Sequence, residues 1–335
     1  GVAIYAGFMI SFLLLRYFGY MESLKVSLVI TTIFIIGLID DILDLRASWK
    51  MTAFIILASV IYMCQGLSIT NLHGFLSITN VNGILSFIIT VFTILAVVNA
   101  INLIDGVDGL AGGLGILILS VLSWVFYKTG HTDYLILTLP MILALGAFLI
   151  FNLWGKDFKI FMGDSGSLLL GMIISISLIR FIQIEHHEVR QLVTVNPVTA
   201  FSLVIVPVFD MIHVFIKRIL KGRSPFYPDR EHIHHTYLKL GFSHRSVTIL
   251  LLAYSAGFFL FTQIISRYFP GYITLGLVIV VALSVWHLPE IYLKRNLRVY
   301  ALKRVTQLKL KEIIRRLNRS EDYEIGREVF GLRSA

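Results

Sequence analysis

The strongest constraint on this chain is the number of apolar runs long enough to cross a lipid bilayer. A membrane-spanning helix needs roughly 17–25 mainly apolar residues, and such runs recur along most of the sequence. Hydrophobic residues make up 57% of the chain and charged residues only 15%, whereas soluble domains carry about 25% charged residues. The sequence therefore predicts an all-α polytopic integral membrane protein.

Ten runs have the length and composition of transmembrane helices. Because they are continuous rather than alternating, and longer than barrel strands, we expect helices and not membrane-crossing strands. The chain enters the first run directly after Gly1, without an initiator Met, so we expect further N-terminal sequence to precede it. The expected spans are residues 2–19, 24–42, 50–66, 83–101, 109–127, 133–151, 165–184, 198–216, 246–266 and 271–288.

Lysine and arginine are distributed unevenly between the two ends of these spans. If the first span starts on the cytoplasmic side, the segments expected inside carry 23 of the 29 Lys and Arg residues. Cytoplasmic loops of membrane proteins are enriched in these residues. We therefore expect a multi-pass protein of the plasma (inner) membrane whose segments 43–50, 102–108, 152–164, 217–245 and 289–335 face the cytoplasm.

The end of the chain differs from the rest in composition. Residues 294–319 combine Lys and Arg with Leu, Ile and Val at near-helical spacing, which is typical of a basic amphipathic helix on anionic membrane lipid. We expect a transmembrane domain over 1–290 and a basic amphipathic cytoplasmic tail over 291–335. The tail explains much of the net charge of +9. No nucleic-acid-binding module is recognisable, so nucleic acid is not an expected partner.

Three carboxylates stand at the expected cytoplasmic end of the second span. Asp40 and Asp44 are four residues apart and share a helix face, with Asp41 beside them. Adjacent carboxylates repel, so their shared site holds a cation or raises one pKa. Carboxylates beside hydrocarbon are costly, which favours a functional site. The alternative is an acidic cap that faces water, with Arg46 and Lys50 as its partners.

A second polar segment follows the fourth span. Asn99, Asn102, Asp105 and Asp108 recur every three residues, which predicts one stripe of amides and carboxylates at a helix end, and several glycines follow them. Such hard oxygen ligands suit Mg²⁺, which binds one or two carboxylates together with substrate phosphates. A glycine-rich packing seam would explain the glycines but not the four polar residues.

Two further segments carry polar residues on the same expected face. Gly163-Asp164-Ser165-Gly166 reads as a helix N-cap with free backbone donors that favour an anion such as phosphate. The loop 217–245 contains Arg, His and Pro, which suit recognition of a phosphate or diphosphate. Zinc is the alternative for its histidines, although the sequence has one cysteine only.

Taken in order, these motifs resemble those of the polyprenyl-phosphate N-acetylhexosamine-1-phosphate transferases, bacterial membrane enzymes that start the synthesis of lipid-linked glycans. The family implies eleven spans, so that its first would precede Gly1. His-Ile-His-His is similar to the UDP-GlcNAc branch, which initiates teichoic acid, O-antigen or enterobacterial common antigen. The resemblance extends to about residue 290, and its motifs are Asp-Asp-x-x-Asp at 40–44, Asn-Ala-Ile-Asn-Leu-Ile-Asp-Gly-Val-Asp-Gly-Leu at 99–110, Phe-Met-Gly-Asp-Ser-Gly-Ser at 161–167 and Pro-Asp-Arg-Glu-His-Ile-His-His at 228–235.

The resemblance implies transfer of GlcNAc-1-phosphate from UDP-GlcNAc to undecaprenyl phosphate, which yields undecaprenyl-diphosphate-GlcNAc and UMP. Phosphoryl transfer depends on positioning and charge neutralisation, so we expect Mg²⁺ as cofactor, with Mn²⁺ as an alternative. Asp164 is the expected metal ligand, assisted by Asn102. Asp40 is expected to position the lipid phosphate, while Asp41 and Asp44 hold the charge of the site.

By the same resemblance, a second set of residues contacts the donor. Phe161 is expected to stack on uracil in a nucleotide pocket that Asp105, Asp108 and Asn152 also line. The residues expected to contact the diphosphate or sugar are Arg223, Arg230, His232, His234 and His235.

Three other functions and one assembly state remain open at this point. A phospho-MurNAc-pentapeptide transferase of peptidoglycan synthesis is the nearest alternative, although it has three consecutive histidines. A cation-coupled transporter would place its acids near mid-membrane, and a lipid-binding scaffold leaves the acidic motifs unexplained. A homodimer is also left open.

Overall fold

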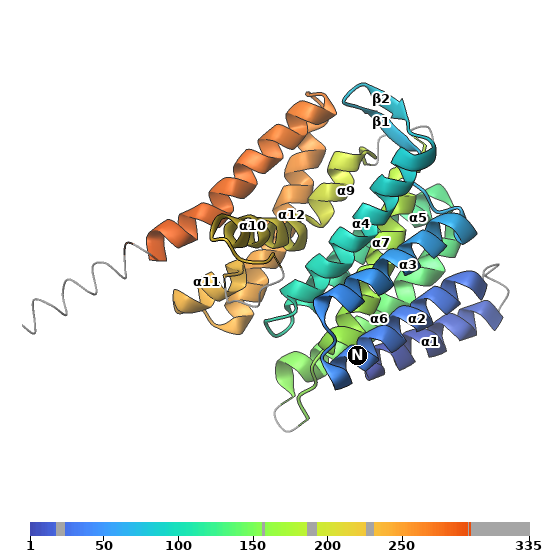
Figure 1. The fold of residues 1–335 in the computed structure, drawn as a ribbon, viewed down its shortest axis with the longest axis horizontal. Coiled ribbons are helices and arrows are strands. Elements are labelled where there is room, and N and C mark those ends of the chain that lie inside the picture. The colour runs from blue at the N-terminus through green and yellow to red at the C-terminus, as the bar shows by residue number, and fades with distance from the viewer. Residues whose placement is uncertain (18–23, 156–157, 186–192, 226–230, 294, 296–335) are drawn as a thin grey trace, which may run out of the picture. The chain divides into compact units, whose positions relative to one another are not determined.

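The computed structural model describes residues 1–17, 24–155, 158–185, 193–225, 231–293 and 295. These residues form apolar helices, most of them long (Figure 1). In chain order the elements are α1 (Val2–Tyr17), α2 (Leu24–Leu43), α3 (Ala47–Gln65), β1 (Asn71–Phe75), β2 (Ile78–Asn80), α4 (Gly83–Ile104), α5 (Leu110–Thr129), α6 (Thr132–Trp154), α7 (Gly163–Ile182), α9 (Pro197–Leu203), α10 (Ile205–Leu220), α11 (Ile233–Lys239) and α12 (His244–Ile265), followed by a helix over Gly271–Leu293.

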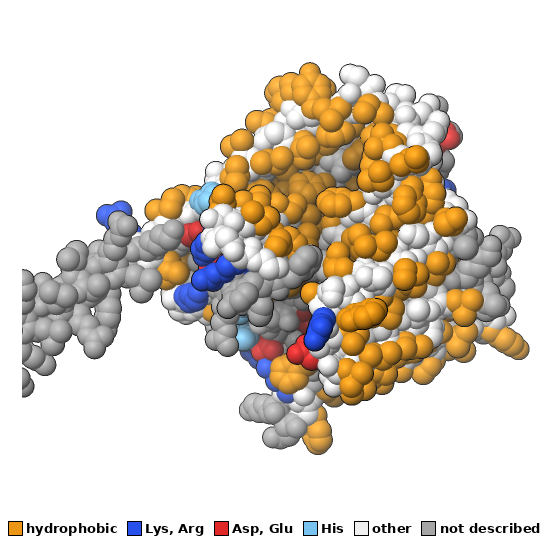
Figure 2. Space-filling model, in the orientation of Figure 1, with side chains coloured by type: hydrophobic (Ala, Val, Ile, Leu, Met, Phe, Trp, Pro, Cys, Tyr) orange, Lys and Arg blue, Asp and Glu red, His pale blue; other side chains and the backbone are white. Residues whose placement is uncertain are grey.

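Among the described residues, seven helices are long and apolar enough to cross a membrane. Every segment predicted to be a span is helical over most of its length, and the protein is a polytopic membrane protein. The count of ten spans stays a prediction, because Val2–Leu15 and Ala47–Met63 are shorter apolar helices. Figure 2 shows hydrophobic side chains over most of the visible face, with most of the visible charged and histidine side chains gathered toward one end.

The segment expected as a span over 198–216 is not one straight helix, because the chain bends by 84° between α9 and α10. Pro207 accounts for the break: it has no N–H to donate to the carbonyl of Leu203, four residues earlier. The Ser255 hydroxyl on α12 lies 3.4 Å from that carbonyl oxygen instead. The bend sends α10 away from the direction of α9, as Figure 1 shows.

Helix α7 is the most buried helix of the bundle, with 94% of its span-length window inside the protein. Small residues let its neighbours approach closely. A Cβ on Gly171 would lie 2.8 Å from the Cα of Val98 on α4, and a Cβ on Gly37 of α2 would lie 2.5 Å from the Cα of Ser165. Helix α7 is therefore packed directly against the backbones of α2 and α4.

A short antiparallel hairpin, β1–β2, corrects the expectation of an all-α chain. Its first strand is tied to the C-terminal end of α7 through Gln183. The side-chain oxygen of Gln183 accepts hydrogen bonds from the backbone N–H groups of Thr70 and Asn71, at 3.1 and 3.2 Å, and from the Thr70 hydroxyl at 2.8 Å. His73 adds a hydrogen bond of 2.6 Å between its Nε2 and the Ile182 carbonyl.

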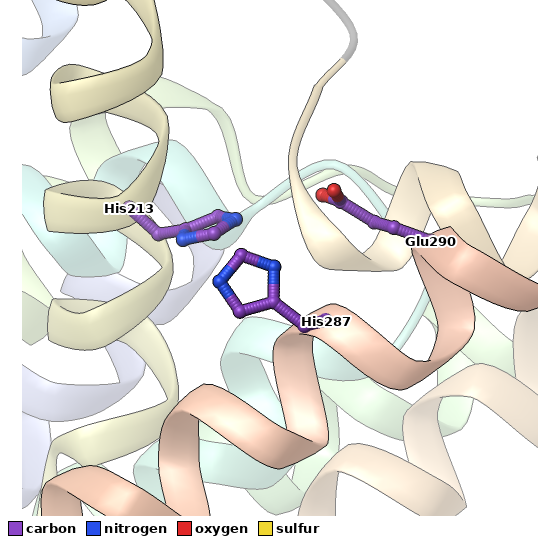
Figure 3. Close-up of side chains that lie close together, drawn as sticks. All are labelled: His213, His287 and Glu290. Atoms are coloured by element: carbon purple, nitrogen blue, oxygen red, sulfur yellow. The ribbon is translucent and has the colours of Figure 1, made fainter.

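The chain divides into two compact units, Gly1–Ser284 and Val285–Ala335. In the second unit, His287 and Glu290 stand three residues apart on one helix and lie on the same side of it (Figure 3). Figure 3 also shows His213, which belongs to α10 of the first unit; its ring stacks on that of Phe209. The predicted amphipathic helix over 294–319 lies almost wholly outside the described residues.

The anchoring of the hairpin can be tested with Gln183→Ala. The substitution removes one acceptor that serves three donors, so we expect the free energy of unfolding to fall by about 1–2 kcal/mol. Limited proteolysis should also cut the segment 70–80 faster. The control is Ser284→Ala, because the Ser284 hydroxyl donates to the Val280 carbonyl of its own helix. Equal stability and equal cleavage of the two variants would contradict this anchoring role.

Candidate functional site: an acidic cavity at the helix ends

A cavity of about 620 Å³ opens where the ends of α2, α4, α6, α7 and α12 meet. Its lining contains six aspartates, far more charge than any apolar core would hold. Lys159 and His244, which the sequence did not indicate, also line it. The structure thus brings together nine of the predicted site residues: Asp40, Asp41, Asp44, Asn102, Asp105, Asp108, Asn152, Phe161 and Asp164.

Asp41 caps the first turn of α7. Its two carboxylate oxygens accept hydrogen bonds from the backbone N–H groups of Asp164 and Ser165, at 2.7 and 3.1 Å, and from the Ser165 hydroxyl at 2.6 Å. A carboxylate at a helix N-terminus also interacts favourably with the helix dipole. The expectation that these N–H groups are free to bind a phosphate is therefore wrong, because Asp41 occupies them.

Gly163 makes this cap possible. Its φ of +67° lies in the left-handed region, which side chains with a Cβ adopt at a cost. A Cβ there would also lie 2.9 Å from an oxygen of Asp41. The Gly-Asp-Ser-Gly motif does begin a helix, as predicted, but the capping side chain comes from α2, 123 residues earlier.

Lys50, on α3, links two of the aspartates. Its ammonium pairs with Asp40 and lies 3.3 Å from Oδ2 of Asp164. Asp40 is buried, and its other oxygen accepts a hydrogen bond of 2.9 Å from the backbone N–H of Leu45. The carboxylates of α2 and α7 are thus joined through one shared cation, and the water-facing acidic cap does not describe Asp40.

Asn102 stands on the other side of Asp164. Its amide nitrogen lies 2.6 Å from Oδ1 of Asp164 and 2.9 Å from the Ser167 hydroxyl. Asp164 therefore has Lys50 near one oxygen and Asn102 near the other. The two residues predicted to hold the metal are in direct contact.

The predicted stripe of four polar residues is only partly correct. Asn102, Asp105 and Asp108 line the cavity, but Asn99 bonds the Leu95 carbonyl and contacts the sulfur of Met51. A step of three residues turns a helix by 300°, so each step drifts by about 60° from a common face. Asn99 is thus turned away from Asn102 on α4, and this helix ends at Ile104, before Asp105 and Asp108.

Asn152 forms hydrogen bonds with two backbone segments beside the cavity. Its side-chain oxygen accepts from the N–H of Gly109 at 2.7 Å, and its nitrogen donates to the Ile160 carbonyl at 2.9 Å. The residue is 5% exposed. Both polar ends of the amide are thus engaged in holding two loops together, which leaves little capacity for a ligand.

The rim of the cavity presents an aromatic ring beside charged groups. Phe161 is 69% exposed, and the Lys159 ammonium lies 5.4 Å from its ring centroid. Lys159 also pairs with Asp108 at 2.7 Å, and Nδ1 of His244 lies 3.4 Å from the same carboxylate. An exposed aromatic face at the mouth of a polar cavity is suited to stacking on a planar ring.

The described residues of the histidine loop, 217–225 and 231–243, are not among the residues that line the cavity. His232 and His234 are buried, with their rings stacked at 5.6 Å between centroids. A Cβ on Gly106 would lie 2.7 Å from Nε2 of His234, so this histidine packs directly against a loop that does line the cavity. Arg223 is exposed, and Arg230 lies outside the described residues.

Burial changes the protonation of two groups near the cavity. Burial, together with the Asp164 and Asp108 carboxylates, raises the pKa of Asp105 to about 7. Burial lowers the pKa of His234 to about 3, despite the opposing charge of Asp210. At neutral pH the His234 ring is therefore uncharged, while Asp105 is poised between its two forms.

The fold and the cavity define a polytopic membrane protein with an acidic site at the ends of its helices, arranged as in an enzyme that handles a charged substrate. The comparisons agree with this class. The chain is similar to glycosyl transferase family 4, whose model matches residues 23–182. This match covers α2 to α7, and with them all nine of the predicted site residues that line the cavity.

Several curated relatives are named undecaprenyl-phosphate alpha-N-acetylglucosaminyl 1-phosphate transferase. The protein of Escherichia coli K12 is 29% identical over 254 residues, which cover 75% of this chain and 67% of the relative. That of Yersinia pestis is 29% identical over 257 residues, covering 75% and 68%. That of Haemophilus influenzae is 34% identical over 225 residues, covering 66% and 62%.

The structural role of Asn152 can be tested with Asn152→Ala. The substitution leaves the Gly109 N–H and the Ile160 carbonyl without their partner, so the free energy of unfolding should fall by about 2–4 kcal/mol. Chemical denaturation in detergent measures this change. Asn99→Ala is the control, since its nitrogen bonds a carbonyl of its own helix. Unchanged stability with weakened nucleotide binding would show instead that Asn152 contacts the ligand.

The raised pKa of Asp105 predicts a pH-dependent stability. The folded pKa of about 7 lies above the ordinary value of 3.8, so folding takes up a proton between these pH values and the cost of ionisation is complete above pH 7. Asp105→Asn should therefore raise the unfolding midpoint by on the order of 5 °C at pH 8 in cation-free buffer, and by little at pH 4.

Thermal unfolding in detergent with a chelator, followed from pH 4 to 8, measures this difference. The control is Asp133→Asn, which changes an exposed carboxylate in the first turn of α6, outside the cavity, and for which we expect no gain of this kind at pH 8. A stability gain in Asp105→Asn that does not change with pH would contradict the raised pKa.

Proposed function

We propose that this protein transfers GlcNAc-1-phosphate from UDP-GlcNAc to undecaprenyl phosphate, giving undecaprenyl-diphosphate-GlcNAc and UMP. The observation that carries the proposal is the cavity in which six aspartates from separate helix ends meet an exposed Phe161 and Lys159. The name of the curated relatives describes the same reaction. It would be the first membrane step in the synthesis of a surface glycan, for example a teichoic acid.

The residues of the cavity fit a divalent cation. Carboxylate and amide oxygens are the ligands that Mg²⁺ prefers, and Mn²⁺ accepts the same set. Asp164 and Asn102 would hold the ion, because both line the cavity and touch each other. When bound, such an ion would neutralise the charge of a diphosphate.

Phosphoryl transfer needs positioning more than covalent chemistry, and the described residues supply it. Asp40 is buried and fixed by Lys50 and the Leu45 N–H, so we assign it to orienting the cationic side chain that meets the lipid phosphate. A phosphate monoester has its second pKa near 6, so it is mostly ionised at pH 7 and needs no strong base.

The donor would enter at the exposed rim. Phe161 offers a ring face for uracil, and Lys159 beside it offers a cation for a phosphate. The carboxylates of Asp105 and Asp108 would face the nucleotide or its metal. The loop with His234 would border the cavity on the side where the diphosphate binds, since His234 packs against Gly106.

A separate apolar cavity is suited to the lipid acceptor. It has a volume of about 250 Å³ and lies between α4, α7, α9 and α10, where the bend at Val204 opens the bundle. Its lining residues include Phe92 and Val97 on α4 and Met211 on α10. A polyprenyl chain is purely apolar, so we assign part of it to this cavity.

The remaining proposals concern location and partners. The active-site cavity would face the cytoplasm, where nucleotide sugars are made, in a multi-pass protein of the plasma or inner membrane. Anionic lipid would bind the basic segment 294–319, and a homodimer is compatible with the fold. The phospho-MurNAc-pentapeptide transferase reaction is the second candidate, because the two reactions differ in the sugar and not in the phosphoryl chemistry.

The proposal is tested by UMP release from purified protein supplied with undecaprenyl phosphate. We expect turnover with UDP-GlcNAc, none with UDP-MurNAc-pentapeptide, and loss of turnover when Mg²⁺ is chelated. Asp164→Asn should lower the rate at least about 100-fold, because it removes a charge from the expected ligand set.

The matched control is Asp133→Asn, which changes a carboxylate outside the cavity and should keep full activity. Turnover in the absence of divalent cation would contradict the assigned cofactor. Turnover with the pentapeptide donor alone would replace the proposed substrate.

A further inference from the structure

Asp210 is a buried carboxylate to which the proposed reaction assigns no role. It stands on α10 within an otherwise apolar stretch and is 1% exposed. A carboxylate in such surroundings is costly unless hydrogen bonds compensate it, and in membrane proteins it commonly marks a functional element.

Both oxygens of Asp210 bind the beginning of the histidine loop helix. Oδ2 lies 2.8 Å from Nδ1 of His232, and Oδ1 accepts the backbone N–H of Ile233 at 2.8 Å. Two adjacent residues are thus fixed by one carboxylate at the point where α11 begins. The position of α11 and the rotation of the His232 ring are set together.

The contact continues from His232 toward the cavity. The ring of His234 stacks on that of His232 with an angle of 7° between their planes. Nε2 of His234 in turn packs against Gly106, in the loop that lines the cavity. Asp210, His232 and His234 therefore form one connected path from α10 to the proposed site of the diphosphate.

We propose that Asp210 is a positioning residue that fixes the tautomer of His232 and holds the histidine loop against the cavity. An ionised carboxylate only accepts hydrogen bonds, so its partner Nδ1 must carry a proton. In the neutral ring, Nε2 of His232 then carries no proton, so it is the nitrogen left to accept a hydrogen bond from a ligand. This is the arrangement by which a carboxylate orients a functional histidine through its other ring nitrogen.

The inference rests on the proposed function only where it names the diphosphate as the ligand of the loop. The positioning role itself concerns the tautomer of the His232 ring, which can be measured without any turnover. Asp210 also lies 22 residues before His232, outside the motif that the resemblance singles out, so the motif alone gives it no role.

The test is Asp210→Asn, observed by ¹⁵N NMR of imidazole-labelled protein in detergent. The amide oxygen of Asn can still accept from Ile233, but its NH₂ group would face Nδ1 of His232. Wild-type protein should show His232 protonated at Nδ1, and the variant should show the Nε2–H tautomer. His232→Gln identifies the resonance by its disappearance.

Activity gives a second readout. With UDP-GlcNAc and undecaprenyl phosphate, we expect kcat for UMP release in Asp210→Asn to fall about 10–100-fold, the loss typical when a carboxylate partner of a functional histidine is removed. Asp210→Glu should restore the Nδ1 proton and part of kcat. The double variant Asp210→Asn/His232→Gln should be no slower than His232→Gln alone, because both act through one ring.

The outcomes separate the two proposals. An Nε2–H tautomer of His232 in wild-type protein, which needs no variant to fold, would overturn the positioning role. Unchanged kcat and an unchanged resonance in Asp210→Asn would overturn it as well. If the resonance switches as expected while wild-type protein releases no UMP from any donor, the positioning role stands and the proposed function fails.

Discussion

The cap that Asp41 forms on α7 is the interaction on which the geometry of the site depends. A helix begins with N–H groups that have no partner within the helix, and here a carboxylate from α2 satisfies two of them. The cap fixes Asp164 beside Lys50 and Asn102. Without it, two N–H groups of the first turn of α7 would lose their hydrogen-bond partner, and Lys50 would be left as the link between the carboxylates of α2 and α7.

The sequence reveals the acidic residues of the site because carboxylates beside hydrocarbon are conspicuous. Asp40, Asp41, Asp105 and Asp164 could be found in this way, and all four line the cavity. Their functions in the fold could not be found, since they depend on packing between distant segments. That Asp41 caps another helix follows from the approach of α2 to α7, which no local pattern encodes.

Other features could not be predicted from the sequence, for different physical reasons. Lys159 and His244 are ordinary polar residues of loops and helix ends, so nothing in their neighbourhood marks them. Pro207, inside the apolar run, is a signal for the break at Val204. The high hydropathy of the run nevertheless favours the prediction of one continuous span. Asp210 is marked in the same way, as a lone acidic residue in an apolar stretch. Its hydrogen bond to His232, on which the inferred positioning role rests, becomes visible only in the structure.

Helix α7 is held at both of its ends by side chains from other elements. At the cavity, Asp41 accepts a hydrogen bond from Ser165 in the first turn of α7. At the far end, Gln183, directly after the last turn, accepts a hydrogen bond from Thr70, which immediately precedes the hairpin. The carboxylate cluster and the hairpin are therefore fixed to opposite ends of one buried helix, whose length sets the distance between them.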